Sequence, residues 1–375
     1  MRSLKLLINI ILFRSFLQQL VNLKYMDLSH SKQLTEIPDL SLASNIEKLN
    51  LDGCSSLLEI HPSIKYLNKL AILSLRHCKC IKNLPTSIHL ESLKQLFLSG
   101  CSNLNTFPEI ACTIEELFLD GTAIEELPLS IECLSRLITL NLENCSRLEC
   151  LSSSLCKLKS LQHLNLSGCT KVERLPAEFG NLEALMEMKA ARSSIKEVPS
   201  SIVQLNNLYR LSFESYQSKS HMGLRLPTMS GLRILTNLDL SDCGITELPN
   251  SLGQLSSLHI LFLDRNNFER IPTSIIHLTN LLWLDLTYCE RLQSLPELPC
   301  NISYMDANCC TSLKELSGFS ILFTPTIWNS QALNFINCFN LDGDELKEIA
   351  KDAQLKIQLM ATAWWNEYHK VSPLQ

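Results

Sequence analysis

The stretch "LFLSGCSNLNTFP", residues 96–108, contains the pattern that decides the fold. Leucine alternates with other residues at its start, so that Leu96 and Leu98 face one side of a short strand and Phe97 faces the other. Cys101 follows three residues after Leu98, and nearly the same phrase returns along the whole chain. The sequence therefore predicts one strand-and-turn unit repeated many times.

The copies align on the second leucine of the alternating pair, which we call the reference residue. Successive reference residues are 21 to 27 positions apart. The thirteen reference residues are Leu28, Leu51, Leu75, Leu98, Leu119, Leu142, Leu166, Ala190, Phe213, Leu240, Leu263, Leu286 and Ala307. This period and the pattern L-x-x-L-x-L-x-x-N/C-x-L are typical of a leucine-rich repeat. We therefore predict an α/β leucine-rich-repeat solenoid, a curved horseshoe with parallel strands on the concave face and short helical or irregular convex segments.

The repeats also set the predicted domain limits. Residues 1–19 are expected to form an N-terminal apolar segment, as a partial or capping repeat, and residues 20–317 an array of about thirteen repeats. Residues 318–375 are expected to form a post-repeat segment with a C-terminal helix, because 343–365 has an amphipathic pattern. The apolar run 6–13 ends at Arg14 without a cleavage pattern and is too short to span a bilayer, so we expect neither a signal peptide nor a membrane segment.

Charge and motifs argue against several function classes. The chain has 33 Lys and Arg against 38 Asp and Glu, a balance that argues against a nucleic-acid partner. It contains no G-x-x-x-x-G-K-[ST], G-x-G-x-x-G or H-E-x-x-H motif, and its nine histidines have no fixed catalytic partners. We therefore expect a non-catalytic protein without a cofactor or a metal site.

Eight of the sixteen cysteines share one position, three residues after the reference residue. They are Cys54, Cys78, Cys101, Cys145, Cys169, Cys243, Cys289 and Cys310. Ser31, Thr122 and Asn266 occupy the same position in other copies, which indicates a small side chain that is buried at the turn and bonds to exposed backbone groups. Zinc binding and redox sensing are the alternatives, but no C-x-x-C pair is present. We predict a ladder of reduced, buried thiols.

The predicted concave face is acidic and carries large aromatic side chains. Eleven acidic residues (Asp27, Asp52, Glu116, Asp120, Glu143, Glu187, Glu214, Asp239, Asp264, Asp285 and Asp306) oppose four basic ones (Lys48, Arg76, Lys189 and Arg210), a balance of −7. Such a face favours a basic protein partner. The candidate partner-binding residues are Phe97, Phe118, Glu116, Asp120, Arg210, Asp239, Phe262, Asp264, Trp283 and Asp285. The alternative is that the aromatic pairs only stabilise the sheet across neighbouring strands.

Several phrases resemble one family closely. "LNLDGCSSLLEI", "LFLDGTAIEELPLSI", "LPELPCNISYMDANCCTSLKEL" and "LNFINCFNLD" are similar to the leucine-rich-repeat region of plant intracellular immune receptors of the Toll/interleukin-receptor, nucleotide-binding type. The resemblance covers about residues 15–342. It implies a module, in the cytoplasm and also in the nucleus, that recognises pathogen effectors and holds the receptor inactive by contacting its nucleotide-binding domain.

No Toll-type domain or P-loop is found in the sequence, so the resemblance implies a fragment or a truncated relative. NAD cleavage and nucleotide binding would belong to the absent domains. Two alternatives stay open at this point: a general intracellular scaffold that docks basic signalling partners, and the substrate-binding arm of an enzyme whose catalytic domain lies elsewhere.

Overall fold

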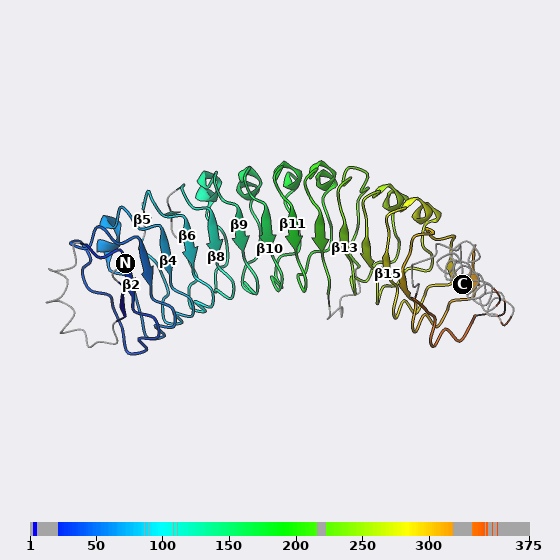
Figure 1. The fold of residues 1–375 in the computed structure, drawn as a ribbon, viewed down its shortest axis with the longest axis horizontal. Helices are drawn as coiled ribbons and strands as arrows, with labels where there is room; N and C mark the ends of the chain where they lie inside the picture. Colours follow the sequence, from blue (N-terminus) through cyan, green and yellow to red (C-terminus); the bar gives the residue numbers. More distant parts are fainter. Residues whose placement is uncertain are drawn as a thin grey trace, which may run out of the picture. The chain divides into compact units, whose positions relative to one another are not determined.

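The computed structural model describes residues 3–5, 22–85, 87–88, 90–107, 109–110, 112–215, 223–317 and 332–341, together with Gly343, Lys347 and Lys351. The chain divides into two compact units, Met1–Leu208 and Tyr209–Gln375. Each unit is a stack of short parallel strands joined by turns and short 3-10 helices (Figure 1). The predicted leucine-rich-repeat fold is confirmed in both units.

In the first unit, each strand pairs in parallel with the strand of the next repeat. The strands are β1 (Ser3–Lys5), β2 (Tyr25–Asp27), β3 (Lys48–Asn50), β4 (Ile72–Ser74), β6 (Gln95–Phe97), β8 (Glu116–Phe118), β9 (Thr139–Asn141), β10 (His163–Asn165) and β11 (Glu187–Lys189). Equivalent positions are opposite each other, so that Leu96 is in register with Leu73 on one side and Leu117 on the other. A separate two-stranded sheet joins β5 (Ser87–Ile88) to β7 (Glu109–Ile110).

The second unit repeats this arrangement. Its strands are β12 (Arg210–Ser212), β13 (Asn237–Asp239), β14 (Ile260–Phe262), β15 (Trp283–Asp285), β17 (Tyr304–Asp306) and β19 (Ala332–Asn334). Strand β16 (Ser294–Leu295) pairs with β18 (Glu315–Leu316) in a separate sheet. The last strand of the main sheet, β19, pairs with β17 in the same register as its predecessors, so that Leu333 is opposite Met305.

The segments that return from one strand to the next contain short 3-10 helices. These are η1 (Pro62–Tyr66), η2 (Leu129–Cys133), η3 (Ser153–Lys157), η4 (Phe179–Asn181), η5 (Ser200–Gln204), η6 (Asn250–Gln254) and η7 (Thr273–His277). In "IPTSIIHL" the extended backbone of Pro272 precedes η7, and Ile275 and Leu278 are fully buried. A proline precedes η2, η5, η6 and η7 in this way and is the first residue of η1, whereas η3 follows Ser152 and η4 follows Glu178. In each of these helices a buried apolar pair equivalent to Ile275 and Leu278 holds the helix against the core.

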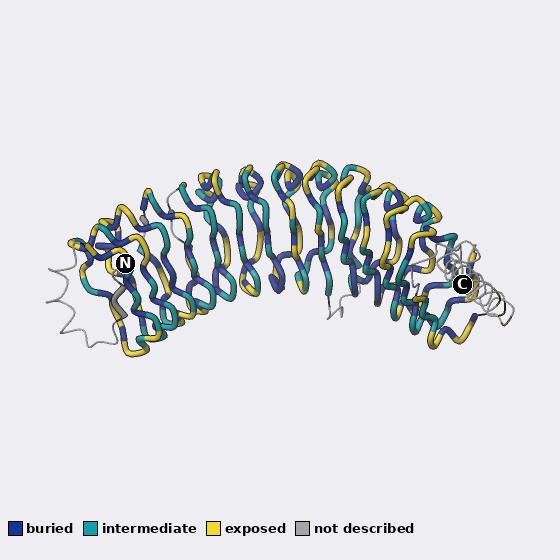
Figure 2. Tube along the Cα trace, viewed as in Figure 1, coloured by how far each residue is buried: buried dark blue, intermediate teal, exposed yellow. Residues whose placement is uncertain are grey.

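The core of each unit is built from the middle residue of every strand and the reference residue that follows it. Leu96 and Leu98 are both 0 % exposed, and the same two positions are buried from β2 to β17 of the main sheets (Figure 2). At the last strand, β19, Leu333 and Phe335 are only partly buried. Burial of each leucine contributes about 1.5–3 kcal/mol, but only while the next repeat covers it.

The turn after each strand adopts a conformation that the sequence analysis did not predict. The residue two positions after the reference residue has a positive φ angle, +71° at Gly100 and +59° at His77. Its amide donates to a carbonyl of the next repeat, as Gly100 N does to Asp120 O at 2.7 Å. The recurring glycine of "GC" follows from this geometry, because glycine adopts positive φ without strain.

The predicted ladder of buried thiols is confirmed for seven of the eight cysteines, whereas Cys243 is only partly buried. Cys101 Sγ donates a hydrogen bond to the carbonyl oxygen of Leu75, the reference residue of the preceding repeat, at 3.1 Å. The other seven predicted cysteines make the equivalent bond at 3.1–3.4 Å. Cys338 makes it too, to Ala307 O, in a copy that the sequence analysis did not count. Burial raises the pKa of Cys101 to about 12, so its thiol keeps the proton that it donates.

The residues that replace cysteine behave differently from one another. The Asn266 side chain donates to Leu240 O and Leu263 O, both at 2.8 Å, and so bridges two repeats. Thr122 Oγ1 donates to Leu119 O of its own repeat at 2.7 Å. The prediction is wrong for Ser31, because its buried hydroxyl has no hydrogen-bond partner in the part of the chain that is described.

Some expectations concern residues outside the described ranges. The apolar run 6–13 lies outside them, as does most of the expected helix at 343–365, of which Gly343, Lys347 and Lys351 are helical and exposed. The domain limits at 19 and 317 stay a prediction. Where the structure describes the chain, no helix is long and apolar enough to cross a membrane.

We expect Cys101→Ala to lower the free energy of unfolding by about 0.5–1.5 kcal/mol, because the buried carbonyl of Leu75 loses the hydrogen bond from the thiol and keeps only the one from the Cys78 amide at 3.2 Å. Urea unfolding followed by circular dichroism measures the change. Cys150→Ala is the matched control, since Cys150 is exposed, and we expect a change within about 0.5 kcal/mol. Equal losses in the two variants would contradict the ladder's role.

We expect Gly100→Ala to destabilise the protein more than Gly121→Ala. Both glycines have positive φ, which costs an alanine about 1–2 kcal/mol. A Cβ at Gly100 would also lie 2.4 Å from His77 Nδ1, whereas a Cβ at Gly121 meets no atom closer than 3.6 Å. In a double-mutant cycle, His77→Ala should reduce the cost of Gly100→Ala to that of Gly121→Ala. A cost that persists without the imidazole would contradict this packing.

Candidate functional site

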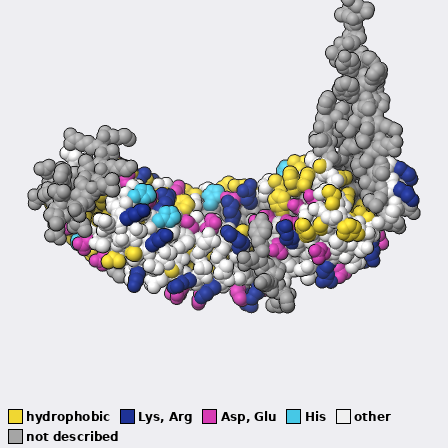
Figure 3. All heavy atoms as spheres, turned by 90° about the horizontal axis from the view of Figure 1, so that it is seen from below, with side chains coloured by type: hydrophobic (Ala, Val, Ile, Leu, Met, Phe, Trp, Pro, Cys, Tyr) yellow, Lys and Arg dark blue, Asp and Glu magenta, His cyan; other side chains and the backbone are white. Residues whose placement is uncertain are grey.

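The outward side of each main sheet, here called the strand face, is the candidate site. It consists of the first and third residues of each strand and the residue that follows the reference residue. The middle residue of the strand points into the core, so its two neighbours point outward. Figure 3 shows hydrophobic side chains gathered over the second unit, with acidic and basic side chains beside them.

In the first unit, the strand face contains a stacked aromatic pair with its own cation. Phe97 and Phe118 are in register on β6 and β8, and their ring centroids are 5.0 Å apart with an angle of 23° between the planes. The guanidinium carbon of Arg76 lies 3.9 Å from the centroid of Phe97. Arg76 Nη1 is also 3.6 Å from Asp52 Oδ2. The Arg76 guanidinium is thus the partner of both the Phe97 ring and the Asp52 carboxylate within the chain.

In the second unit, three aromatic rings form a cluster around Trp283. Its ring centroid is 4.1 Å from that of Tyr304, with an angle of 31°, and 6.5 Å from that of Phe262, with an angle of 69°. Trp283 is in register with Ile260 and Tyr304, so these three residues form an apolar row across the strands. Trp283 is 40 % exposed, which is unusual for so large an apolar side chain.

Three carboxylates lie in the parallel row at the third strand position. Asp239, Phe262, Asp285 and Asp306 follow one another in register. Burial raises the pKa of Asp239 and of Asp285, and neighbouring carboxylates raise it further. Asp306 accepts hydrogen bonds from the Tyr304 hydroxyl and from the backbone amide of Asn308. The second unit therefore has an acidic row beside an apolar row.

The predicted site residues are divided between the two units. Phe97, Phe118, Glu116 and Asp120 belong to the first unit, and the other six belong to the second. Asp120 accepts hydrogen bonds from the side chains of Ser99 and Asn141, so its oxygens are already engaged in the sheet.

Asp264 has little surface to offer a partner. It is only 8 % exposed, and its carboxylate is 2.9 Å from Arg265 Nη1. Arg210 and Asp239 occupy the first and third positions of neighbouring strands in the second unit.

Sequence reasoning missed Tyr304, the closest aromatic neighbour of Trp283. The signal was present, because "YMD" at 304–306 aligns with "WLD" at 283–285 and places Tyr304 at the same strand position as Trp283. A tyrosine at an outward position also forms part of an ordinary sheet, so the sequence alone did not single it out.

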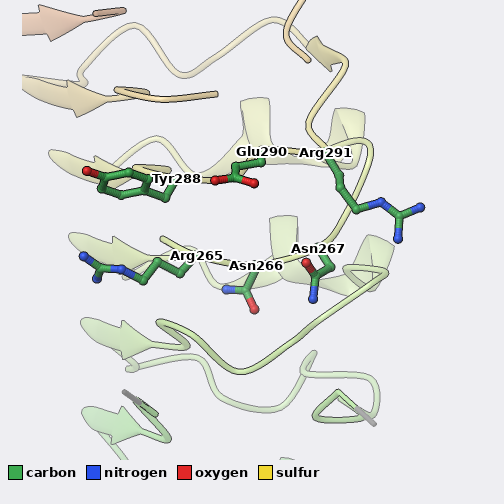
Figure 4. Close-up of a pocket in the computed structure, with 6 residues that line it drawn as sticks. All are labelled: Arg265, Asn266, Asn267, Tyr288, Glu290 and Arg291. Carbon is green, nitrogen blue, oxygen red and sulfur yellow. The ribbon is translucent and has the colours of Figure 1, made fainter. Parts of the chain in front are cut away.

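A cavity of about 540 Å³ lies along the turns beside this face (Figure 4). Its lining consists of Arg265, Asn266, Asn267, Tyr288, Glu290 and Arg291. Most of these polar groups already have partners within the chain. Arg265 pairs with Asp264, Arg291 pairs with Glu269 at 2.8 Å, and the Asn266 side chain donates a hydrogen bond to the backbone carbonyl of Leu240. No group of three or more His, Cys, Asp or Glu that could hold a metal ion is found among the described residues.

Comparisons with known proteins agree with this architecture. A "Leucine-rich repeat region" family model matches residues 121–239, and a "Leucine rich repeat" model matches residues 233–290. The chain is 41 % identical over 351 residues, 93 % of its length, to "Disease resistance-like protein DSC1" of Arabidopsis thaliana. The chain belongs to the family of plant disease resistance proteins of the Toll/interleukin-receptor, nucleotide-binding type, and corresponds to their leucine-rich-repeat region.

Other relatives place it in the same group. "Disease resistance protein RPP2B" of Arabidopsis thaliana is 42 % identical over 93 % of this chain, and "TMV resistance protein N" of Nicotiana glutinosa is 39 % identical over 79 %. The chain spans 28 %, 29 % and 26 % of the length of DSC1, RPP2B and N, respectively.

Solved structures support the same fold. The functional domain of InlJ from Listeria monocytogenes, whose description includes a cysteine ladder, gives a TM-score of 0.58 at 17 % identity, covering 80 % of this chain and 64 % of that one. The plant peptide hormone receptor RGFR1, solved in complex with RGF2, gives 0.51 at 19 % identity, covering 80 % and 60 %.

We expect the double variant Asp239→Asn, Asp285→Asn to gain stability relative to the native protein as the pH rises. Because the folded-state pKa of each carboxyl is raised above its unfolded value, ionisation costs stability as the pH rises through the interval between the two values. Unfolding free energies of both proteins at several pH values between about 4 and 7 test this. A stability difference that is the same at every pH would contradict the raised pKa values.

Proposed function

We propose that this chain is the recognition and autoinhibitory region of a plant disease-resistance receptor. In this role it binds a pathogen effector or the nucleotide-binding domain of the receptor, and it has no catalytic activity of its own. The alignment of 93 % of the chain with DSC1 and RPP2B is the observation that carries the proposal. Leucine-rich-repeat arrays use their strand face as an extended binding surface.

The strand face of the second unit supports a protein partner. Trp283 supplies exposed aromatic surface with the half-buried ring of Tyr304 against it, and Asp239, Asp285 and Asp306 place carboxylates in the neighbouring row. Aromatic side chains within a polar rim are typical of protein interfaces.

We further propose that the protein works in the cytoplasm, and also in the nucleus. The cysteine ladder requires reduced thiols, because each one donates its proton to a carbonyl. A reducing compartment maintains them in that state.

The test is co-precipitation of the chain with the nucleotide-binding domain of DSC1, expressed as a separate polypeptide in plant leaves. We expect binding by the native chain and a clear loss of binding by Phe262→Ala, Trp283→Ala, since the pair removes the centre of the aromatic cluster. The circular dichroism spectrum and the unfolding midpoint verify that the variant is folded.

Leu129→Ala, Ile234→Ala is the matched control, because both residues are exposed apolar side chains outside the strand rows. We expect it to bind as the native chain does. No binding by the native chain, or equal losses in the two double variants, would contradict the proposed use of this face.

A further inference from the structure

In the described part of the chain, two arginines each lie close to both an aromatic ring and a carboxylate. On the first unit's strand face, Arg76 lies over Phe97 at 3.9 Å and within 3.6 Å of Asp52. In the second unit, along the turns, Arg265 is 2.9 Å from Asp264 and its guanidinium carbon lies 5.3 Å from the ring centroid of Tyr288. The repeat geometry thus brings outward rings and carboxylates close enough to hold one cation together.

The strand face of the second unit has the ring and the carboxylates of such a site but not the cation. Trp283 stacks on Tyr304, and Asp285 and Asp306 occupy the third position of the same two strands. Within the described ranges, no ion pair joins Asp239, Asp285 or Asp306 to a lysine or arginine. Among the described residues, these three carboxylates therefore have hydrogen-bond donors but no paired cation, beside a tryptophan, the strongest cation–π acceptor among the aromatic side chains.

The carboxylates are also poorly solvated. The side chains of Asp239 and Asp285 are partly buried, and each lies near further carboxylates, Glu214 for the first and Asp264 and Asp306 for the second. A positive charge placed among them would relieve this repulsion. The apolar row of Ile260, Trp283 and Tyr304 runs alongside, so a matching partner would bring apolar groups as well.

We propose that the strand face of the second unit binds a segment of a partner protein in which arginine or lysine side chains alternate with apolar ones. The basic side chains lie against Asp239, Asp285 and Asp306, and the apolar ones lie on Ile260, Trp283 and Tyr304. The inference rests on the proposed protein-binding function and specifies the chemistry of the partner. In this complex the partner supplies to the second unit's strand face the cation that Arg76 supplies within the first unit.

The probe is a fluorescent 12-residue peptide in which leucine and arginine alternate, compared with the same peptide containing citrulline, which is neutral and similar in shape. Fluorescence anisotropy at physiological ionic strength gives both dissociation constants. We expect the arginine peptide to bind about tenfold more tightly or better, because each charge-assisted contact is worth more than a neutral one. Equal binding of the two peptides, or no binding of the arginine peptide, overturns the proposal.

Two double variants locate the peptide. We expect Asp285→Asn, Asp306→Asn to weaken binding of the arginine peptide by about tenfold or more. Glu247→Gln, Glu315→Gln removes the same charge from two exposed residues of the second unit outside the strand rows, and we expect a change within about twofold. Equal weakening in both variants overturns the proposal, since it shows attraction by net charge alone.

Unfolding midpoints of both variants establish that each is folded under the binding conditions. The outcome is separable from that of the proposed function. If the DSC1 nucleotide-binding domain binds the chain but the peptides are not distinguished, the assigned chemistry fails and the proposed function stands. If the peptides are distinguished but the domain does not bind, the partner chemistry stands and that partner is wrong.

Discussion

The buried carbonyl at the end of each strand is the constraint on which the structure depends. The chain must turn there, and the carbonyl of the reference residue accepts the amide three residues on, as Leu75 O does from Cys78 N at 3.2 Å, which leaves its second lone pair away from water. A small donor three residues into the next turn satisfies it, as Cys101 does for Leu75 and Asn266 does for Leu240. Where such a donor is present, a repeat depends on its successor for a side-chain hydrogen bond as well as for the burial of its leucines, so polar and apolar contacts join the same two repeats.

This constraint also determines what the chain can present to a partner. Because the turn is held at the same position in each repeat, the strands stay in register, and their first and third residues form straight rows across each sheet. The side chains at those outward positions do not pack in the core, so the residue type there can differ from repeat to repeat. In the first unit, Phe97 at a third strand position lies close to Arg76, which pairs with Asp52; Arg76 and Asp52 each follow a reference residue, and the three form a complete set of ring, guanidinium and carboxylate. In the second unit the outward positions hold exposed Trp283 with carboxylates that have no cation of their own in the described part of the chain. The same repeat framework thus presents carboxylates with a paired arginine in the first unit and, among the described residues, carboxylates without a paired cation in the second.

The sequence predicts the framework well because the framework is repeated. The leucine alternation identifies the buried strand positions, the recurring cysteine identifies the buried position in the turn, and the period of 21 to 27 residues shows where each repeat begins again. The structure confirms these assignments. The positive φ angle in the turn was not predicted, because residues other than glycine, such as His77 and Arg192, occupy that position in some repeats. The strand face was harder to predict, since outward residues obey no repeat. Phe97 and Phe118 stack in the structure, but Asp264 is buried against Arg265. Tyr304 joins the cluster at the strand position equivalent to Trp283, although a tyrosine at an outward position is also an ordinary part of a sheet.

The central claim is that the ladder cysteines are reduced, buried donors which join neighbouring repeats. Labelling the native protein with a thiol reagent and locating the label by mass spectrometry tests it most directly. The account predicts that Cys112, Cys150 and Cys300, which are exposed, react in the native state. Cys101, Cys145 and Cys169, which are buried with raised pKa values, should react only at denaturant concentrations that unfold the first unit. Native-state labelling of Cys101 or Cys169 as fast as that of Cys150, or their recovery in disulfides, would contradict it.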